Sequence, residues 1–219
     1  MSELKLYFFP RACSGVTMTA LEMAGLDYGS EVVNIMKGEQ KSPEYLRIHR
    51  SGKVPALVVD GVPVTENASI LTMLDAMAPD AGILPKTDNP LEKAQQRSDL
   101  VWCSSTIHPM VRQIRMPMRF TTEAPFEGIK ADGIAKFADV LSEIEERVAD
   151  GKWFYGDQFS IVDVYLRWLA LTAASAGFPL SDFPNTAAYV QRVSQQPAAQ
   201  RAIAKEAAAV EEAGIVFPS

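Results

Sequence analysis

One loop near the start of the chain carries residue types that could do sulfur chemistry. The segment Pro10-Arg-Ala-Cys-Ser14 lies between a short apolar stretch and a stretch with helical periodicity. A side chain in this place would lie at the positive N-terminal end of a helix, which lowers the pKa of a thiol and stabilises a bound thiolate. Cys13 and Ser14 are therefore rival candidates for contact with a sulfur atom. The alternative is a buried, inert cysteine beside a serine that only caps the helix.

A second stretch carries groups that suit a small ligand with a carboxylate and an ammonium group. Its two halves are Gly52-Lys-Val-Pro-Ala-Leu57 and Thr65-Glu-Asn-Ala-Ser-Ile70. We expect Glu66 and Asn67 at the N-terminus of a helix, where unpaired N–H groups and the helix dipole bind carboxylates. The Glu66 carboxylate could pair with an ammonium group of the same ligand. Alternatively, the stretch is only a hairpin followed by a helix cap.

The elements that position these residues alternate between strands and helices. Over about 80 residues the pattern predicts strand, helix, strand, helix, strand, strand and helix, which is typical of an α/β domain with a final hairpin. The expected strands are 4–9, 31–35, 54–59 and 62–64. The expected helices are 14–24, a short helix that begins at Ser42-Pro43, and 66–78.

The rest of the chain has helical periodicity. A polar, turn-rich segment, 81–90, predicts a linker, and 91–219 then forms a helical domain. Within it, Ser160-Ile-Val-Asp163 is a capping box that should begin a buried helix over 162–174. The alanine-rich segment 198–213 predicts a surface helix.

Several polar residues of the helical part are candidates for a role in binding. Arg112, Arg115 and Arg119 are spaced to share one face of a helix. They could face an acidic ligand tail, although a solvated basic face or dimer contacts are the alternatives. His108, in Ser105-Thr-Ile-His-Pro109, could stabilise a thiolate or move a proton, although a lone histidine is more often structural.

Composition and charge exclude several classes of function. The formal net charge of −6 gives no attraction to phosphates, so we expect no nucleic-acid partner. No apolar run approaches the roughly 20 residues that cross a bilayer, and no signal-like segment begins the chain, so we expect a cytoplasmic protein with no membrane partner. Its two cysteines, far apart in the sequence, predict neither a disulfide framework nor a metal site.

Together, these motifs resemble the cytosolic glutathione transferase family over essentially the whole chain, and they are closest to its bacterial, beta-class-like members. The resemblance implies a thioredoxin-like α/β domain of order βαβαββα over residues 1–80, the linker 81–90, and an all-α domain over 91–219 that forms the electrophile pocket. It also implies a homodimer, glutathione as the co-substrate, and no metal or organic cofactor.

The resemblance assigns roles to single residues. It implies a cis Val54–Pro55 peptide whose valine backbone pairs with the cysteinyl backbone of glutathione, and Glu66 and Asn67 at the γ-glutamyl end. The whole glutathione-binding set that it implies is Lys37, Lys53, Val54, Pro55, Glu66 and Asn67. This chain departs from the family pattern in having Asn67 where serine is usual, and Ile48-His-Arg-Ser51 where Asn-Pro is common.

The catalytic residues implied by the resemblance are Cys13, Ser14 and His108. Cys13 matches the active-site cysteine of the beta class, whereas other classes use a serine or tyrosine hydroxyl beside the glutathione sulfur. His108 matches the beta-class histidine that reaches toward the cysteine. The expected function is a detoxifying transferase of alkyl or aryl groups, which adds the glutathione thiolate to a small hydrophobic electrophile. The alternatives are a glutathione-dependent thiol transferase or isomerase based on Cys13, and a non-catalytic ligand-binding protein.

Overall fold

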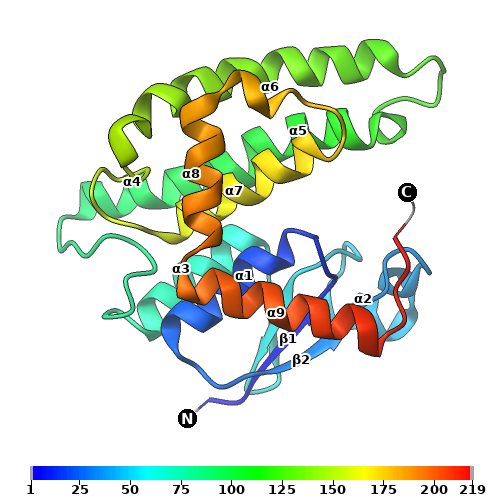
Figure 1. Cartoon of the computed structure of the whole chain (residues 1–219). Helices are drawn as coiled ribbons and strands as arrows, with labels where there is room; N and C mark the ends of the chain where they lie inside the picture. Colours follow the sequence, from blue (N-terminus) through cyan, green and yellow to red (C-terminus); the bar gives the residue numbers. More distant parts are fainter. Residues whose placement is uncertain (1, 218–219) are drawn as a thin grey trace. The chain divides into compact units, whose positions relative to one another are not determined.

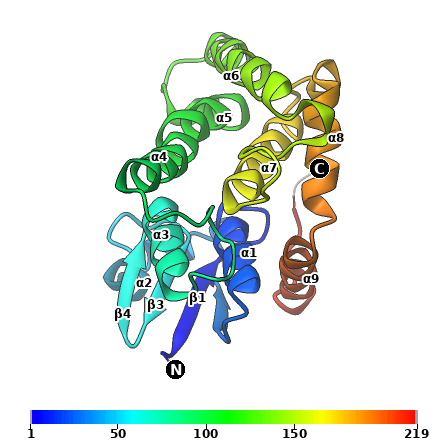
Figure 2. The same ribbon diagram turned by 90° about the vertical axis from the view of Figure 1, so that its left-hand side faces the viewer.

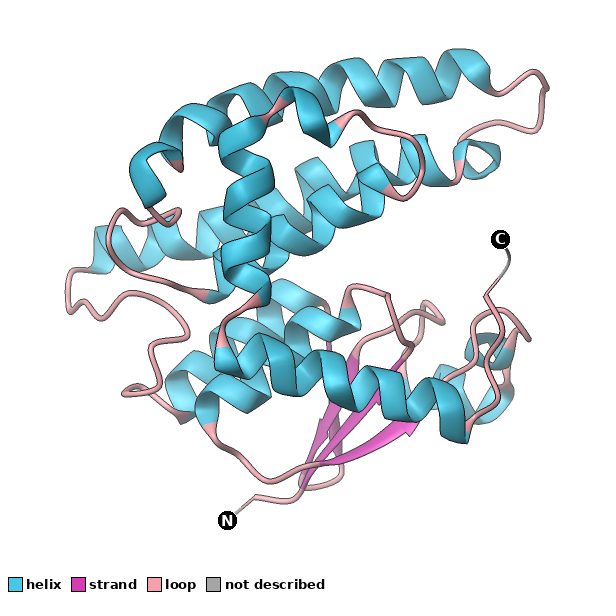
Figure 3. Ribbon diagram, viewed as in Figure 1, coloured by secondary structure: helices cyan, strands magenta, loops and turns pink. Residues whose placement is uncertain are grey.

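The computed structural model describes residues 2–217 and divides into two compact units (Figure 1). The first unit combines Met1–Ile83 with Gln196–Ser219, and the second is Leu84–Gln195. All the named strands belong to the first unit, whereas the second is helical (Figure 3). The sequence predicts a helical domain over the whole of 91–219, but the structure groups its last segment with the first unit.

A four-stranded mixed sheet in the order β2-β1-β3-β4 forms the centre of the first unit. The strands are β1 (Leu4–Phe8), β2 (Gly29–Val32), β3 (Ala56–Val59) and β4 (Val62–Thr65). β1 pairs in parallel with β2 after the crossover helix α1 (Ser14–Ala24), whereas β3 runs antiparallel to both β1 and β4. This arrangement confirms the expected thioredoxin-like fold.

The two faces of the sheet are covered by different helices. Leu6 and Phe8 of β1 are buried on one side, and Tyr7 points to the other, where its ring lies 5.8 Å from that of Tyr45 in α2 (Pro43–Ile48). Helices α1 and α3 (Asn67–Met77) pack on each other (Figure 2). Their buried apolar side chains include Val16, Leu21, Ile70, Leu71 and Leu74.

The second strand lies earlier in the chain than the sequence predicts. It was expected over 31–35 and spans Gly29–Val32. Its partner β1 ends at Phe8, so the last backbone bond is the one that Val33 N–H donates to the Phe8 carbonyl (2.8 Å). Asn34 then turns the chain, because its Oδ1 accepts two N–H groups of the following residues (3.1 Å each).

The helix α9 (Pro197–Glu212) packs against α1, around the buried carboxylate of Glu22. Arg201 Nε donates to Glu22 Oε2 (2.9 Å), and the Tyr28 hydroxyl donates to Oε1 (2.7 Å). Burial acts to raise the pKa of Glu22, but hydrogen bonds from Lys205, Tyr28 and Arg201 outweigh it and leave that pKa below its usual value. These bonds explain why α9 belongs to the first unit.

The second unit is a group of helices packed around α7. The helices are α4 (Pro90–Val101), α5 (His108–Arg115), α6 (Glu127–Arg147), α7 (Ile161–Ala174) and α8 (Pro184–Ser194). A π-helical stretch, Trp102–Ile107, joins α4 to α5. Most of α7 is buried, as the sequence predicts. Among the described residues, no helix is long and apolar enough to cross a membrane.

The start of α7 confirms the predicted capping box. The Ser160 hydroxyl accepts from Val162 N–H (3.2 Å), and Asp163 Oδ2 accepts from Ser160 N–H (2.7 Å). Asp163 Oδ1 accepts from Phe154 N–H (2.7 Å) and from the Tyr189 hydroxyl (2.8 Å). Asp163 therefore begins α7 and also ties it to two neighbouring segments.

The three arginines do not share one helix face, so that prediction was wrong. Arg112 and Arg115 lie in the last turn of α5, which ends at Arg115. Arg119 lies in a separate 3-10 turn, Pro117–Arg119, after a break at Met116 (φ −138°, ψ 57°). Pro117 explains the break, because the residue before a proline disfavours the helical region.

Candidate functional site

The loop between β1 and α1 places Cys13 and Ser14 in different surroundings. Cys13 is partly exposed at the N-cap position of α1, and its thiol donates to the carbonyl oxygen of Val54 (Sγ···O 3.5 Å). Ser14 is fully buried, and its hydroxyl both donates to Phe9 O (3.0 Å) and accepts from Phe9 N–H (3.2 Å). The serine therefore fastens the two ends of the loop, and the thiol is the group directed toward Val54.

The same loop is strained and is supported by the end of the chain. Arg11 has φ +64°, in the left-handed region that is uncommon for residues other than glycine. Its guanidinium lies 4.0 Å from the centroid of the Phe217 ring, and the Phe9 ring lies 5.9 Å from the same ring. The residues after α9 thus pack on the loop that carries Cys13.

The loop before β3 contains the Val54–Pro55 peptide, which is cis, as the resemblance implies. The Tyr45 hydroxyl of α2 holds this loop by donating to the Lys53 carbonyl (2.6 Å). Gly52 has φ +55°, and a Cβ there would collide with the carbonyl oxygen of Gln40, so only glycine fits. The Lys53 side chain is exposed.

His49 lies buried in the segment before this loop. Its Nδ1 accepts a hydrogen bond from Ser51 N–H (3.3 Å). Burial lowers the pKa of His49, while the charge of Glu66 acts in the opposite direction. The neutral ring, which keeps Nδ1 as an acceptor, is therefore the form that supports the loop.

The start of α3 presents one side chain outward and one inward. Glu66 is exposed with φ +69°, and within the described part of the chain its side chain makes no cap for α3. Asn67 is buried, with its Nδ2 donating to the Cys13 carbonyl (3.0 Å) and its Oδ1 accepting from the Thr17 hydroxyl (2.6 Å). The asparagine amide therefore reaches into the fold.

These contacts bring several of the predicted site residues together in the first unit. Cys13 touches Val54 through its thiol and Asn67 through its carbonyl, and Glu66 precedes Asn67. Lys37 lies in the exposed turn after β2. His108 belongs to the second unit, where its ring packs edge-on against that of Trp168 with centroids 4.7 Å apart.

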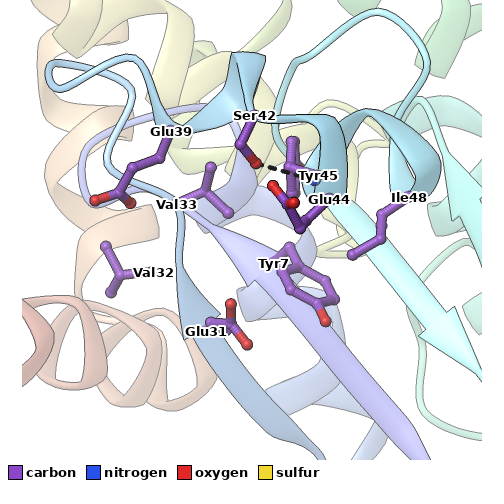
Figure 4. Close-up of a pocket in the computed structure, with 9 residues that line it drawn as sticks. All are labelled: Tyr7, Glu31, Val32, Val33, Glu39, Ser42, Glu44, Tyr45 and Ile48. Carbon is purple, nitrogen blue, oxygen red and sulfur yellow. Dashed lines mark hydrogen bonds between the residues drawn. The ribbon is translucent and has the colours of Figure 1, made fainter.

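A cavity of about 340 Å³ lies elsewhere in the first unit, between the sheet and α2 (Figure 4). Among its described lining residues are Tyr7, Tyr45 and the three glutamates Glu31, Glu39 and Glu44. Lys5 Nζ already lies 2.7 Å from a Glu31 oxygen, and Glu39 already accepts a backbone N–H (2.6 Å). None of the predicted site residues is among those lining residues, so we assign it no part in the candidate site. Among residues 2–217, no cluster of acidic, cysteine or histidine side chains is arranged to hold a metal ion.

The candidate site could hold a small peptide that carries a sulfur atom. The backbone at Val54 can pair with a peptide backbone, and Glu66 can pair with an ammonium group. The first N–H groups of α3 have no partner within their own helix, so they suit a carboxylate. The sulfur of such a ligand would then lie near Cys13.

Comparison with known proteins agrees with this geometry. Residues 12–77 match the family model of the glutathione S-transferase N-terminal domain, and residues 115–197 match that of the C-terminal domain. A zeta-class glutathione S-transferase from Euphorbia esula is 31% identical over 206 residues, which cover 92% of this chain and 90% of the relative. The chain belongs to the glutathione S-transferase family.

Members of this family with different activities resemble the chain. A maleylacetoacetate isomerase from Pseudomonas aeruginosa is 28% identical over 203 residues, 91% of this chain and 95% of the relative. A glutathione transferase homologue from Sulfitobacter, solved with bound glutathione, is 28% identical with a TM-score of 0.80, and the match covers 99% of this chain and 100% of the homologue. A bacterial beta-class glutathione S-transferase from Sphingomonas chungbukensis is 29% identical with a TM-score of 0.79, over 92% and 98% of the two chains. Thus the glutathione S-transferase fold is shared, while the relatives' names include both transferases and isomerases.

Proposed function

We propose that this chain is a glutathione transferase that binds glutathione, favours its thiolate and presents it to a small hydrophobic electrophile. The observation that carries the proposal is the position of the Cys13 thiol beside the Val54 carbonyl, with the Ser14 hydroxyl turned into the fold. The helix start beside this thiol favours a negative sulfur. We therefore choose Cys13 over Ser14 as the residue nearest the glutathione sulfur.

The remaining binding roles follow the shape and charge of glutathione. The Val54 backbone would pair with the cysteinyl backbone, beside the cis Pro55. Glu66 would pair with the ammonium of the γ-glutamyl end, and the first turn of α3 would hold its carboxylate. The exposed lysines Lys37 and Lys53 would neutralise the glycine carboxylate.

Thiolate formation is the step that the site must favour. A free thiol with a pKa near 8.5 is only a few per cent thiolate at neutral pH. We expect the bound glutathione thiol to titrate about two units lower. Calorimetry measures glutathione binding, and ultraviolet titration of the complex follows thiolate absorbance. A bound thiol that still titrates near 8.5 would rule out activation, and a protein that does not bind glutathione would be a non-catalytic member of the family.

The second candidate function uses Cys13 itself as the nucleophile, and the partial exposure of its thiol favours it. The Cys13 thiolate would attack one sulfur of a glutathione mixed disulfide, form a new disulfide and release the other thiol as thiolate. A Cys13→Ala variant separates the two functions. Retained conjugation of an activated aryl halide supports the transferase, whereas loss of all activity together with a trapped Cys13–glutathione disulfide in the wild type supports thiol transfer.

Four further features stay predictions. The maleylacetoacetate isomerase relatives make glutathione-dependent isomerisation of maleylacetoacetate the first alternative activity to test for the same site. The homodimer and the cytoplasmic location rest on the family resemblance. For His108, a His108→Asn variant with an unchanged pH profile of conjugation would exclude a role in moving the proton.

A further inference from the structure

The side chain of Asn67 links the two segments that we propose bind opposite ends of glutathione. It is the first residue of α3, and its amide uses both of its functional atoms inside the fold. The Nδ2 donates to the carbonyl of Cys13 (3.0 Å), and the Oδ1 accepts from the hydroxyl of Thr17 (2.6 Å). Asn67 is only 5% exposed and Thr17 is fully buried. A side chain held in this way is directed away from the ligand.

The two partners of this amide lie one helical turn apart on α1. Cys13 precedes the first residue of the helix and Thr17 follows it by one turn, so a single amide can span the carbonyl and the hydroxyl. The link needs a donor and an acceptor on neighbouring atoms. An asparagine amide has both, whereas an aspartate carboxylate lacks the donor. The residue type is therefore matched to this internal contact.

Ser14 and the Cys13 thiol also help to fix the same loop. Ser14 holds Phe9 through both of its hydrogen bonds, and the Cys13 thiol donates to Val54. The Asn67 bond to the Cys13 carbonyl ties this loop directly to the start of α3. The Asn67 side chain therefore helps to fix the position of Cys13 relative to the start of α3.

We propose that Asn67 is a positioning residue that acts through Cys13 and not through contact of its side chain with glutathione. The proposal rests on the proposed function for its role in catalysis, but its effect on Cys13 is present without any ligand. Losing the amide loosens the Cys13 carbonyl from α3, so the thiol lies less regularly at the start of α1. The helix start favours the thiolate, whereas the weak thiol bond to the Val54 carbonyl favours the protonated form. Loss of the helix-start effect should outweigh loss of that weak bond, so the thiolate should then form at higher pH.

The pH profile of Cys13 alkylation by iodoacetamide, in the absence of glutathione, tests this effect. Burial raises the pKa of the Cys103 thiol, which is fully inaccessible, so alkylation of the folded protein reports Cys13. We expect Asn67→Ala and Thr17→Val each to move the midpoint up by about 0.5 pH units or more. The double variant should shift no further than Asn67→Ala, because both changes break one network.

Matched variants keep the result interpretable. Thr19→Val makes the same change in the same helix, where the buried Thr19 hydroxyl donates to Gly15 O within α1 (2.8 Å), and it should leave the midpoint unchanged. If Asn67→Ala does not fold, Thr17→Val removes the hydrogen bond that orients the same amide and leaves α3 unchanged. An unchanged midpoint in Thr17→Val, together with a glutathione Kd raised more than tenfold in Asn67→Ala alone, would overturn the proposal and make Asn67 a direct ligand contact.

The proposed function and this inference fail separately. If the wild type does not bind glutathione by calorimetry, the transferase proposal fails, while a shared midpoint shift in the Asn67 and Thr17 variants would still support the link. If glutathione binds with a lowered thiol pKa and both variants keep the wild-type midpoint, the function stands and the positioning role is excluded.

Discussion

The helices α3 and α7 begin in opposite ways. At α7, Ser160 and Asp163 cap each other, and the buried Asp163 carboxylate also binds Phe154 and Tyr189. At α3, Glu66 occupies the N-cap position with φ +69°, is exposed, and gives the helix no side-chain cap among the described residues.

The difference separates a helix start built for stability from one available to a ligand. At α7 the capping box supplies acceptors for N–H groups of the helix start from Ser160 and Asp163 themselves. At α3 the backbone keeps an unfavourable conformation at Glu66 and the helix start has no side-chain cap among the described residues, which costs stability but suits an anion. Variants at the two sites should therefore affect different quantities.

The largest effect should follow a change at α7. Asp163→Asn should lower the free energy of unfolding by about 3 kcal/mol. The reason is that one carboxylate oxygen, which now accepts hydrogen bonds, becomes an amide N–H₂ group that faces N–H or O–H donors and cannot accept from them. Urea unfolding followed by tryptophan fluorescence measures this change, since all three tryptophans are in the second unit. Asp157→Asn, at an exposed position nearby, is the control. A loss below about 1 kcal/mol, no greater than that of an ordinary cap, would contradict the comparison.

A change at α3 should affect binding and leave stability nearly intact. Glu66→Gln should raise the glutathione Kd about tenfold, because a charge-assisted hydrogen bond to the ammonium becomes a neutral one, while the free energy of unfolding changes by less than about 0.5 kcal/mol. Calorimetry and urea unfolding measure the two quantities. Glu44→Gln, at an exposed glutamate in the first turn of α2, should change neither. Equal affinity in Glu66→Gln and the wild type would exclude the ammonium contact.

The smallest effect on stability should come from His49. Like the Ser160 hydroxyl, the His49 ring accepts a hydrogen bond from a backbone N–H group, but unlike serine the ring can take up a proton near neutral pH. The fold keeps His49 neutral with a lowered pKa, so its contribution is complete above the unfolded pKa of about 6.5 and is lost as pH falls toward the folded pKa. We expect the urea midpoint of the first unit, followed by circular dichroism, to fall by roughly 0.3 M between pH 7.5 and 5 through this residue.

His49→Asn is the matched variant for that experiment, since asparagine keeps an acceptor that does not titrate. Its midpoint should depend less on pH than that of the wild type. Faster amide exchange of residues 49–54 at pH 5 in the wild type alone would assign the effect to the loop before Pro55. The same pH dependence in both proteins would exclude His49 as its source.

The features predicted from the sequence are those fixed by residues a few positions apart. The Ser160–Asp163 capping box, the Asp60-Gly61 hairpin and the glycine stop of α1 all depend on local spacing, and the structure confirms them. The end of β2 was missed because it depends on where β1 stops. Arg119 was placed on a helix face that Pro117 interrupts.

The contacts inside the candidate site were less predictable. Asn67 and Thr17 are 50 positions apart, and Tyr45 of α2 donates to the Lys53 carbonyl in the loop before β3. The sequence could name Asn67 as a site residue from its place at a helix start, but the direction of its amide depends on packing between α1 and α3. The packing of α9 on the first unit depends on the contact between Arg201 and Glu22, which are 179 positions apart. A contact over this distance gives no short-range pattern in the sequence from which it could be predicted.

The return of α9 has a consequence for the order in which the protein forms on the ribosome. Glu22 emerges early, whereas Arg201 and Lys205 emerge only after the whole second unit has been synthesised. Until then, the nascent first unit has a carboxylate that lacks two of its cationic partners and an α1 surface that α9 has yet to cover. The first unit should therefore reach its final form last, although most of it is synthesised first.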